Sequence, residues 1–138
     1  MRIEFSNLKL YDGGKIIAGK NDRARVLITE LEGDIQFLNQ SNDLVFSEVD
    51  FNVVLLQKSL VEWLNKNPIV TFVFEGEPIG WLLNLKFDVL ADEIVFHVQS
   101  AGGDIVRAKF PRKEFLAGVA SYCTNLSNAV EKAYGVKI

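Results

Sequence analysis

The chain has 138 residues, of which 49% are hydrophobic and 24% charged, and its net charge is −3. These values are ordinary for a globular domain and exclude a disordered chain, which would carry far fewer large apolar residues. They also disfavour nucleic acid as a partner, because proteins that neutralise phosphates usually have a strong basic excess. No linker-like segment interrupts the sequence, so we expect a single α+β domain over residues 1–138.

The single cysteine, Cys123, excludes an intramolecular disulfide bond. The first residues alternate charged and apolar side chains, which does not suit a signal peptide. No apolar run reaches the ~20 residues that a membrane-spanning helix requires. We therefore expect a cytoplasmic protein without membrane contact.

Apolar residues in the first half of the chain predict several short strands. Their expected ranges are 2–11, 24–32, 35–38 and 44–46. The alternation in the first strand changes phase, so a β-bulge at Ser6-Asn7 is expected to restore one apolar face. Gly33-Asp34 is typical of a tight turn and is expected to join the second strand to the third.

A helix is predicted over residues 53–64, where apolar side chains recur at helical spacing. Asp50 is expected to cap its first turn. Pro68 is expected to end it, because proline disfavours helical geometry in the preceding residue. Residues 69–74 are apolar on both faces, which predicts a central strand.

The second half predicts an antiparallel meander that is closed by a long amphipathic helix. Clean alternation places strands at 81–89, 94–99 and 105–110, and the helix runs from Pro111 to about Tyr134. The fold class is therefore α+β, with an antiparallel sheet of about six to seven strands. One central helix and the long C-terminal helix are expected to pack on one face of it.

Short turns set the expected register of the meander. Phe87 should pair with Phe96, and Phe96 with Ala108. Val98 should pair with Val106, which puts Val106 in the core under the last helix. Cys123 lies on the apolar stripe of that helix and is expected to be buried with them.

The same register collects polar side chains on the outer face of the sheet. Its expected middle row is Lys86, His97 and Arg107, with His97 between two cations. The predicted binding residues are Asn84, Lys86, His97, Gln99, Arg107 and Lys109. Such a patch would steer an acidic partner, and it suits a protein better than a nucleic acid, which favours exposed aromatic side chains.

No pattern in the sequence predicts catalysis, a metal site or a cofactor. His97 is the only histidine, and no nucleophile is predicted beside it. The acidic residues lack the regular spacing of metal-binding loops. The segment Asp12-Gly13-Gly14-Lys15 lacks the spacing of a phosphate-binding loop.

The expected function is a non-enzymatic protein-binding module that works through the outer sheet face. No motif matches a named family. By fold class alone the chain resembles toxin-neutralising immunity proteins, small bacterial domains without catalytic residues, and the resemblance implies an inhibitory or regulatory role. One alternative is a small-molecule-binding or hydrolase-like protein with a pocket that Trp63, Trp81 and phenylalanines line. Another is a structural subunit that forms a homodimer through an exposed sheet edge.

Overall fold

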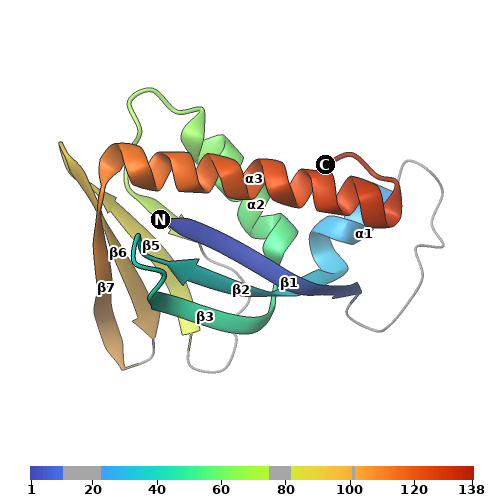
Figure 1. The fold of residues 1–138 in the computed structure, drawn as a ribbon, viewed down its shortest axis with the longest axis horizontal. Coiled ribbons are helices and arrows are strands. Elements are labelled where there is room, and N and C mark those ends of the chain that lie inside the picture. The colour runs from blue at the N-terminus through green and yellow to red at the C-terminus, as the bar shows by residue number, and fades with distance from the viewer. Residues whose placement is uncertain (11–22, 75–81, 101) are drawn as a thin grey trace.

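Two antiparallel sheets and their covering helices form the computed structural model, which describes residues 1–10, 23–74, 82–100 and 102–138 (Figure 1). The α+β prediction is confirmed, and the described residues contain seven strands. The long helix α3 (Arg112–Tyr134) crosses the top of the molecule in this view, with α2 (Val53–Leu64) behind it. No helix of the described residues is long and apolar enough to cross a membrane.

The first sheet has three antiparallel strands, with the second strand in the middle. They are β1 (Arg2–Leu10), β2 (Leu31–Leu38) and β3 (Leu44–Phe51). The irregularity expected in β1 is confirmed, because its pairing with β2 shifts between Ser6 and Lys9. Asn7 lies at the shift with a φ of 54°.

Helix α1 (Arg23–Glu30) occupies most of the segment expected as a strand over 24–32, so that prediction is wrong. A short apolar run does not distinguish a buried helix from a strand. Packing decides here: Leu27 is fully buried, and α1 contacts both α2 and β2. The strand β2 begins directly after the helix, at Leu31.

Gly33 lies inside β2, so the tight turn expected at Gly33-Asp34 is also wrong. A Cβ atom at Gly33 would lie 2.9 Å from Cδ2 of Leu8 and 3.1 Å from the carbonyl oxygen of Ser6. Glycine is therefore needed because the irregular part of β1 approaches β2 closely at this position.

Helix α2 begins as predicted, but Asp50 does not cap it. Asn52 precedes the helix and its side chain makes no capping hydrogen bond. Asp50 belongs to β3, where Oδ1 accepts from Nζ of Lys9 at 2.7 Å. The helix begins after Asn52, two residues beyond Asp50, and the Asp50 carboxylate pairs with Lys9 of β1 instead.

The second sheet has four antiparallel strands in sequential order. They are β4 (Phe72–Phe74), β5 (Leu82–Val89), β6 (Glu93–Ser100) and β7 (Gly103–Pro111). The strand predicted over 69–74 is shorter than expected and lies at the edge, not in the centre. Its apolar outer residue, Val73, is 42% exposed.

The register of the meander is confirmed over most of its length. Phe87 pairs with Phe96, and Phe96 with Ala108. Beyond Phe96 the pairing shifts by one residue, so that Val106 lies opposite His97. The expected pairing of Val98 with Val106 is therefore wrong, and Val106 is 54% exposed.

The shift originates at the hairpin turn between β6 and β7. Ser100 pairs directly with Gly103, whose φ of 129° is a conformation that favours glycine. This tight turn advances the start of β7 by one residue. The extra residue is absorbed as a β-bulge between Val106 and Ala108, after which the expected pairing resumes.

Aromatic side chains fill the core between the two sheets and α3. Phe37 of the first sheet stacks on Phe96 of the second, with ring centroids 4.9 Å apart. Phe115 of α3 contacts Phe87 edge-on at 4.8 Å. The meander and α3 thus share one core, and the residues that alternate with these phenylalanines lie on the other face of the second sheet.

Candidate functional site

The candidate site lies on the outer face of the four-stranded sheet. Successive residues of a strand point to opposite faces, so the side chains that alternate with the buried phenylalanines point outward. The outer face is defined here by Thr71, Val73, Asn84, Lys86, Asp88, Val95, His97, Gln99, Asp104, Val106 and Lys109.

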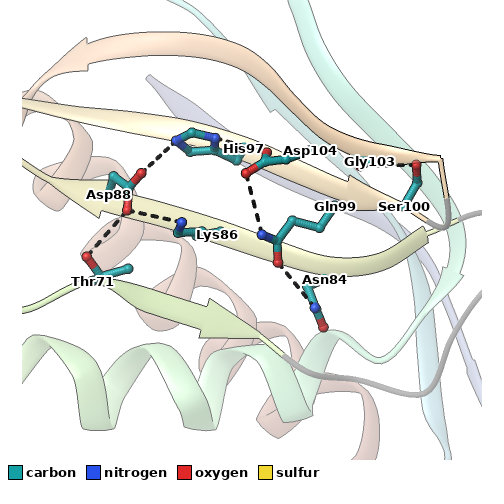
Figure 2. A network of polar contacts seen from close by, with 9 residues as sticks. All are labelled: Thr71, Asn84, Lys86, Asp88, His97, Gln99, Ser100, Gly103 and Asp104. Atoms are coloured by element: carbon teal, nitrogen blue, oxygen red, sulfur yellow. Dashed lines mark hydrogen bonds and ion pairs between the residues drawn. The ribbon is translucent and has the colours of Figure 1, made fainter.

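A chain of polar contacts crosses this face from β5 through β6 to β7 (Figure 2). Nδ2 of Asn84 donates to Oε1 of Gln99 at 3.2 Å. Nε2 of Gln99 lies 3.5 Å from Oδ2 of Asp104. The other oxygen of Asp104 lies 3.0 Å from Nδ1 of His97.

Asp88 continues the chain on the other side of the His97 ring (Figure 2). Its Oδ2 atom lies 2.8 Å from Nε2 of His97, off the line of a hydrogen bond. Its Oδ1 atom lies 3.6 Å from Nζ of Lys86 and accepts a hydrogen bond from Thr71 at 3.4 Å. The polar network therefore extends from Asn84 on β5 across β6 and β7 and back to Thr71, the residue that precedes β4.

His97 lies between two carboxylates, so the expectation that it lies between two cations is wrong. The one-residue shift in β7 places Val106, rather than Arg107, opposite His97. Lys86 is its neighbour on β5 as predicted, but the ammonium group of Lys86 contacts Asp88. Favourable pairing of opposite charges decides where these flexible side chains point.

The contacts of His97 limit its chemistry. Each ring nitrogen faces a carboxylate, and the side chain is only 13% exposed. A general base needs a nitrogen within reach of a substrate proton. The arrangement orders the imidazole ring on the sheet and does not present it to a ligand.

The structure brings together Asn84, Lys86, His97 and Gln99 of the predicted binding residues. Arg107 lies in the bulge, and Lys109 lies in the next row, opposite Val95. The predicted binding residues did not include three members of the network. These are Thr71, Asp88 and Asp104.

The alternation of β5 already placed Asp88 two residues from Lys86 on the same face. Asp104 could be placed opposite Gln99 only by knowing the tight turn at Gly103. The carboxylates of Asp88 and Asp104 make the outer face mixed in charge rather than basic.

Cys123 lies on α3 at its contact with α2, on the side of the sheet away from His97. Its Sγ atom lies 4.0 Å from the carbonyl oxygen of Gln57. Burial raises the pKa of the Cys123 thiol to about 11, which keeps it protonated at neutral pH. Because the thiolate is the reactive form, this cysteine is a packing residue and not a nucleophile.

In the part of the chain that the structure describes, no group of three or more His, Cys, Asp or Glu side chains is arranged to hold a metal ion. Asp88 and Asp104 contact different ring nitrogens of His97. The two carboxylates and one ring nitrogen therefore do not converge on a shared position.

Trp63, expected to line a pocket, is packed into the core and is 2% exposed. Its ring contacts Phe72 and Phe87, with centroid distances of 5.5 and 5.7 Å. Trp81, its expected partner, lies outside the described residues. A cavity of about 480 Å³ lies elsewhere, between β1 and α3.

Comparison with known proteins identifies no relative: no protein-family model matches the chain, and searches of curated proteins and of solved structures find no match. The arguments about function therefore depend on the geometry of the chain itself.

Proposed function

We propose that this chain is a non-enzymatic protein-binding module that contacts its partner through the outer face of the four-stranded sheet. The observation that carries the proposal is a row of paired residues across all four strands: Val73, Lys86, His97 and Val106. The two valines at its ends are 42% and 54% exposed. Between them lies the ordered polar network.

This combination suits a protein interface. Exposed valines at both ends supply apolar surface that a partner can remove from water. The polar side chains between them already contact one another in the free protein. Binding therefore costs less conformational entropy than it would on a face of mobile side chains.

The mixed charge of the face refines the chemistry of the partner. Lys86 and Lys109 lie among Asp88 and Asp104, so the face does not act as a uniformly basic surface. We infer that the partner is recognised by matching alternating charges, which mainly contributes specificity. An immunity-like or regulatory role fits such a module, since both act by covering a surface of another protein, and we propose that it acts in the cytoplasm.

Site-specific photo-crosslinking tests the proposal. A photoreactive residue at Val106 is compared with one at Val61, an apolar position on α2 that is 39% exposed. We expect a protein partner that crosslinks from position 106 and not from position 61. That partner is then purified and titrated against the Val106→Glu and Val61→Glu variants.

Val106→Glu should weaken binding at least about tenfold, which corresponds to ~1.4 kcal/mol, because it places a charge in the apolar part of the interface. Val61→Glu should bind like the unmodified chain. The proposal is wrong if no partner crosslinks selectively from position 106, or if Val106→Glu binds that partner with unchanged affinity.

A second copy of the chain is the competing partner, through β7, which within the described residues is the last strand of its sheet. The residues from Gly103 to Arg107 are exposed, but the bulge interrupts the edge that a neighbouring strand would pair with. Bulged edge strands resist such pairing. A crosslinked homodimer from position 106 would replace the proposed partner with a second copy.

A further inference from the structure

The ring of His97 bridges two carboxylates that belong to different strands (Figure 2). Oδ1 of Asp104, at the start of β7, lies 3.0 Å from Nδ1 in hydrogen-bonding alignment. Oδ2 of Asp88, on β5, lies 2.8 Å from Nε2 at the opposite edge of the ring. The imidazole itself belongs to β6, between these two strands. One ring therefore holds two negative charges across three strands.

The number of protons on the ring decides whether both contacts are favourable. A charged imidazolium ring has an N–H group on each nitrogen, whereas a neutral ring has an N–H group on only one. With a neutral ring, one of the carboxylates therefore faces a nitrogen lone pair at 3.0 Å or less. Two hydrogen-bond acceptors at this distance repel each other.

Water does not separate the ring from Asp88. The Nε2 atom is buried, and no hydrogen bond satisfies it within the described residues. A buried polar atom that is left without a partner costs free energy. The contact of Nε2 with the Asp88 carboxylate is therefore favourable when this nitrogen carries a proton and unfavourable when it carries a lone pair.

Geometry indicates which carboxylate a neutral ring retains. Asp104 is aligned with Nδ1, and its second oxygen lies 3.5 Å from Nε2 of Gln99. Asp88 is not aligned with Nε2 of His97, although the two atoms are close. A neutral ring with its proton on Nδ1 keeps the hydrogen bond to Asp104 and leaves Asp88 beside the lone pair.

The other charged groups around the ring come from the two neighbouring strands. On β5, Nζ of Lys86 lies 3.6 Å from Oδ1 of Asp88. On β7, the charged residues nearest in register to His97 are Asp104 and Arg107, with Arg107 in the bulge. The ammonium group of Lys86 thus accompanies the carboxylate that a neutral ring releases.

We propose that His97 is a proton-dependent switch in the outer face of the sheet. The charged ring holds Asp88 and Asp104 together across β6. When the ring loses its proton from Nε2, Asp88 turns away together with Lys86, and Asp104 stays bound to Nδ1. Ring deprotonation therefore makes this part of the face more negative and moves two of its charged groups.

The switch is a property of the free chain, so it does not depend on a binding partner. Its consequence for recognition rests on the proposed function: a partner that contacts Lys86 and Asp88 would meet a different charge pattern when the ring is neutral. Histidine ordinarily changes its charge between about pH 5 and 8, which is the range that the test covers.

NMR spectroscopy of the free chain over this range tests the switch. His97 is the only histidine, so the ¹⁵N signals of its ring are unambiguous and report which nitrogen carries a proton. Nuclear Overhauser contacts report the distance from the ring to the β protons of Asp88 and Asp104. Aspartate carboxyl groups ordinarily titrate near pH 3.9, below this range, so changes within it follow the ring.

We expect protons on both ring nitrogens at the acidic end and on Nδ1 alone at the basic end. The contacts between the ring and Asp88 should be lost as the ring becomes neutral, and those with Asp104 should remain. In Asp88→Asn the side-chain amide can donate to the lone pair of Nε2, so the contacts at position 88 should persist over the whole range.

A second variant tests whether His97 itself drives the movement. His97→Gln has no group that titrates at this position, so the signals of Lys86 and Asp88 should not change between the two ends of the range. Amide spectra verify that both variants keep the fold.

The inference is overturned if the ring keeps the same contacts with Asp88 at both ends of the range, or if the neutral ring carries its proton on Nε2. It is also overturned if the Asp88 signals of His97→Gln still change with pH. No partner is present in these measurements, so their outcome and that of crosslinking from position 106 are independent.

Discussion

The two faces of the four-stranded sheet use the same strands for opposite purposes. On the inner face, Phe87 and Phe96 are fully buried against the aromatic core. On the outer face, His97 and its neighbours form a polar network between exposed valines. One strand register therefore satisfies aromatic packing on one side and carries a polar network on the other.

The β-bulge in β7 affects the two faces differently. The inner pairs of Phe96 with Ala108 and of Ile94 with Phe110 lie on the regular side of it. The outer network depends on it, because the shift exposes Val106 and brings Asp104 to His97. A change of one residue therefore alters the chemistry of the surface without altering the main aromatic contacts.

The largest effect is expected from truncation on the inner face. Phe96→Ala should lower the free energy of unfolding by roughly 3–5 kcal/mol, because it leaves a cavity among Phe37, Phe46 and Phe87. Urea denaturation followed by tryptophan fluorescence measures this loss. Val106→Ala on the outer face should cost less than about 0.5 kcal/mol. Similar losses for both variants would contradict the assignment of the two faces.

A second prediction compares thiols on the two sides of the sheet. In a Val106→Cys variant, the new outer thiol should react with a disulfide reagent at pH 7.4 at least about 100-fold faster than Cys123, which is buried and largely protonated. Since the pKa of Cys123 is raised to about 11, its rate should continue to rise with pH until about that value. Mass spectrometry of the labelled peptides distinguishes the two sites. Equal rates in the folded protein would show that the α2–α3 contact does not protect the thiol.

A small effect on stability is expected within the polar network. Asp88→Asn removes the charge that contacts Lys86 and His97, and it should cost roughly 0.5–1 kcal/mol, since these groups are partly exposed. The matched control is Asp92→Asn, an exposed position in the β5–β6 turn whose carboxylate makes no hydrogen bond or ion pair within the described residues. Chemical denaturation of both variants, together with the NMR signals of the His97 ring, measures the difference. If Asp88→Asn matched the control in stability and left these signals unchanged, the network would not order the outer face.

The spacing of apolar residues in the sequence was sufficient to predict the regular strands and the two longer helices. The alternation from Leu82 to Phe110 predicted the meander and most of its pairing, because a slip would expose its phenylalanines. Helical spacing likewise predicted α2 and α3. The short apolar segment around Leu27 fits either a helix or a strand, and its contacts with distant elements made it helical.

The candidate site was only partly predictable from the sequence, because only some of its residues lie where the strand pairing is regular. Lys86 and His97 share a row because both lie in regular pairing, which the alternation already contains. The approach of Asp104 depends on a turn that is one residue shorter than expected. A difference of that size alters no hydrophobic pattern, so it leaves no clear signal in the sequence.

By itself the amino-acid sequence determined the α+β class, the long last helix and which phenylalanines of the meander are buried, because each follows from repeating apolar positions. Only the tertiary structure decided the edge position of β4, the charge environment of His97 and the cavity between β1 and α3. The cavity lies where Met1 and Gly118, which are distant in sequence, come into close contact. The position of Asp104 beside His97 depends on the turn at Gly103, whose positive φ favours glycine, and neither feature leaves a hydrophobic pattern in the sequence.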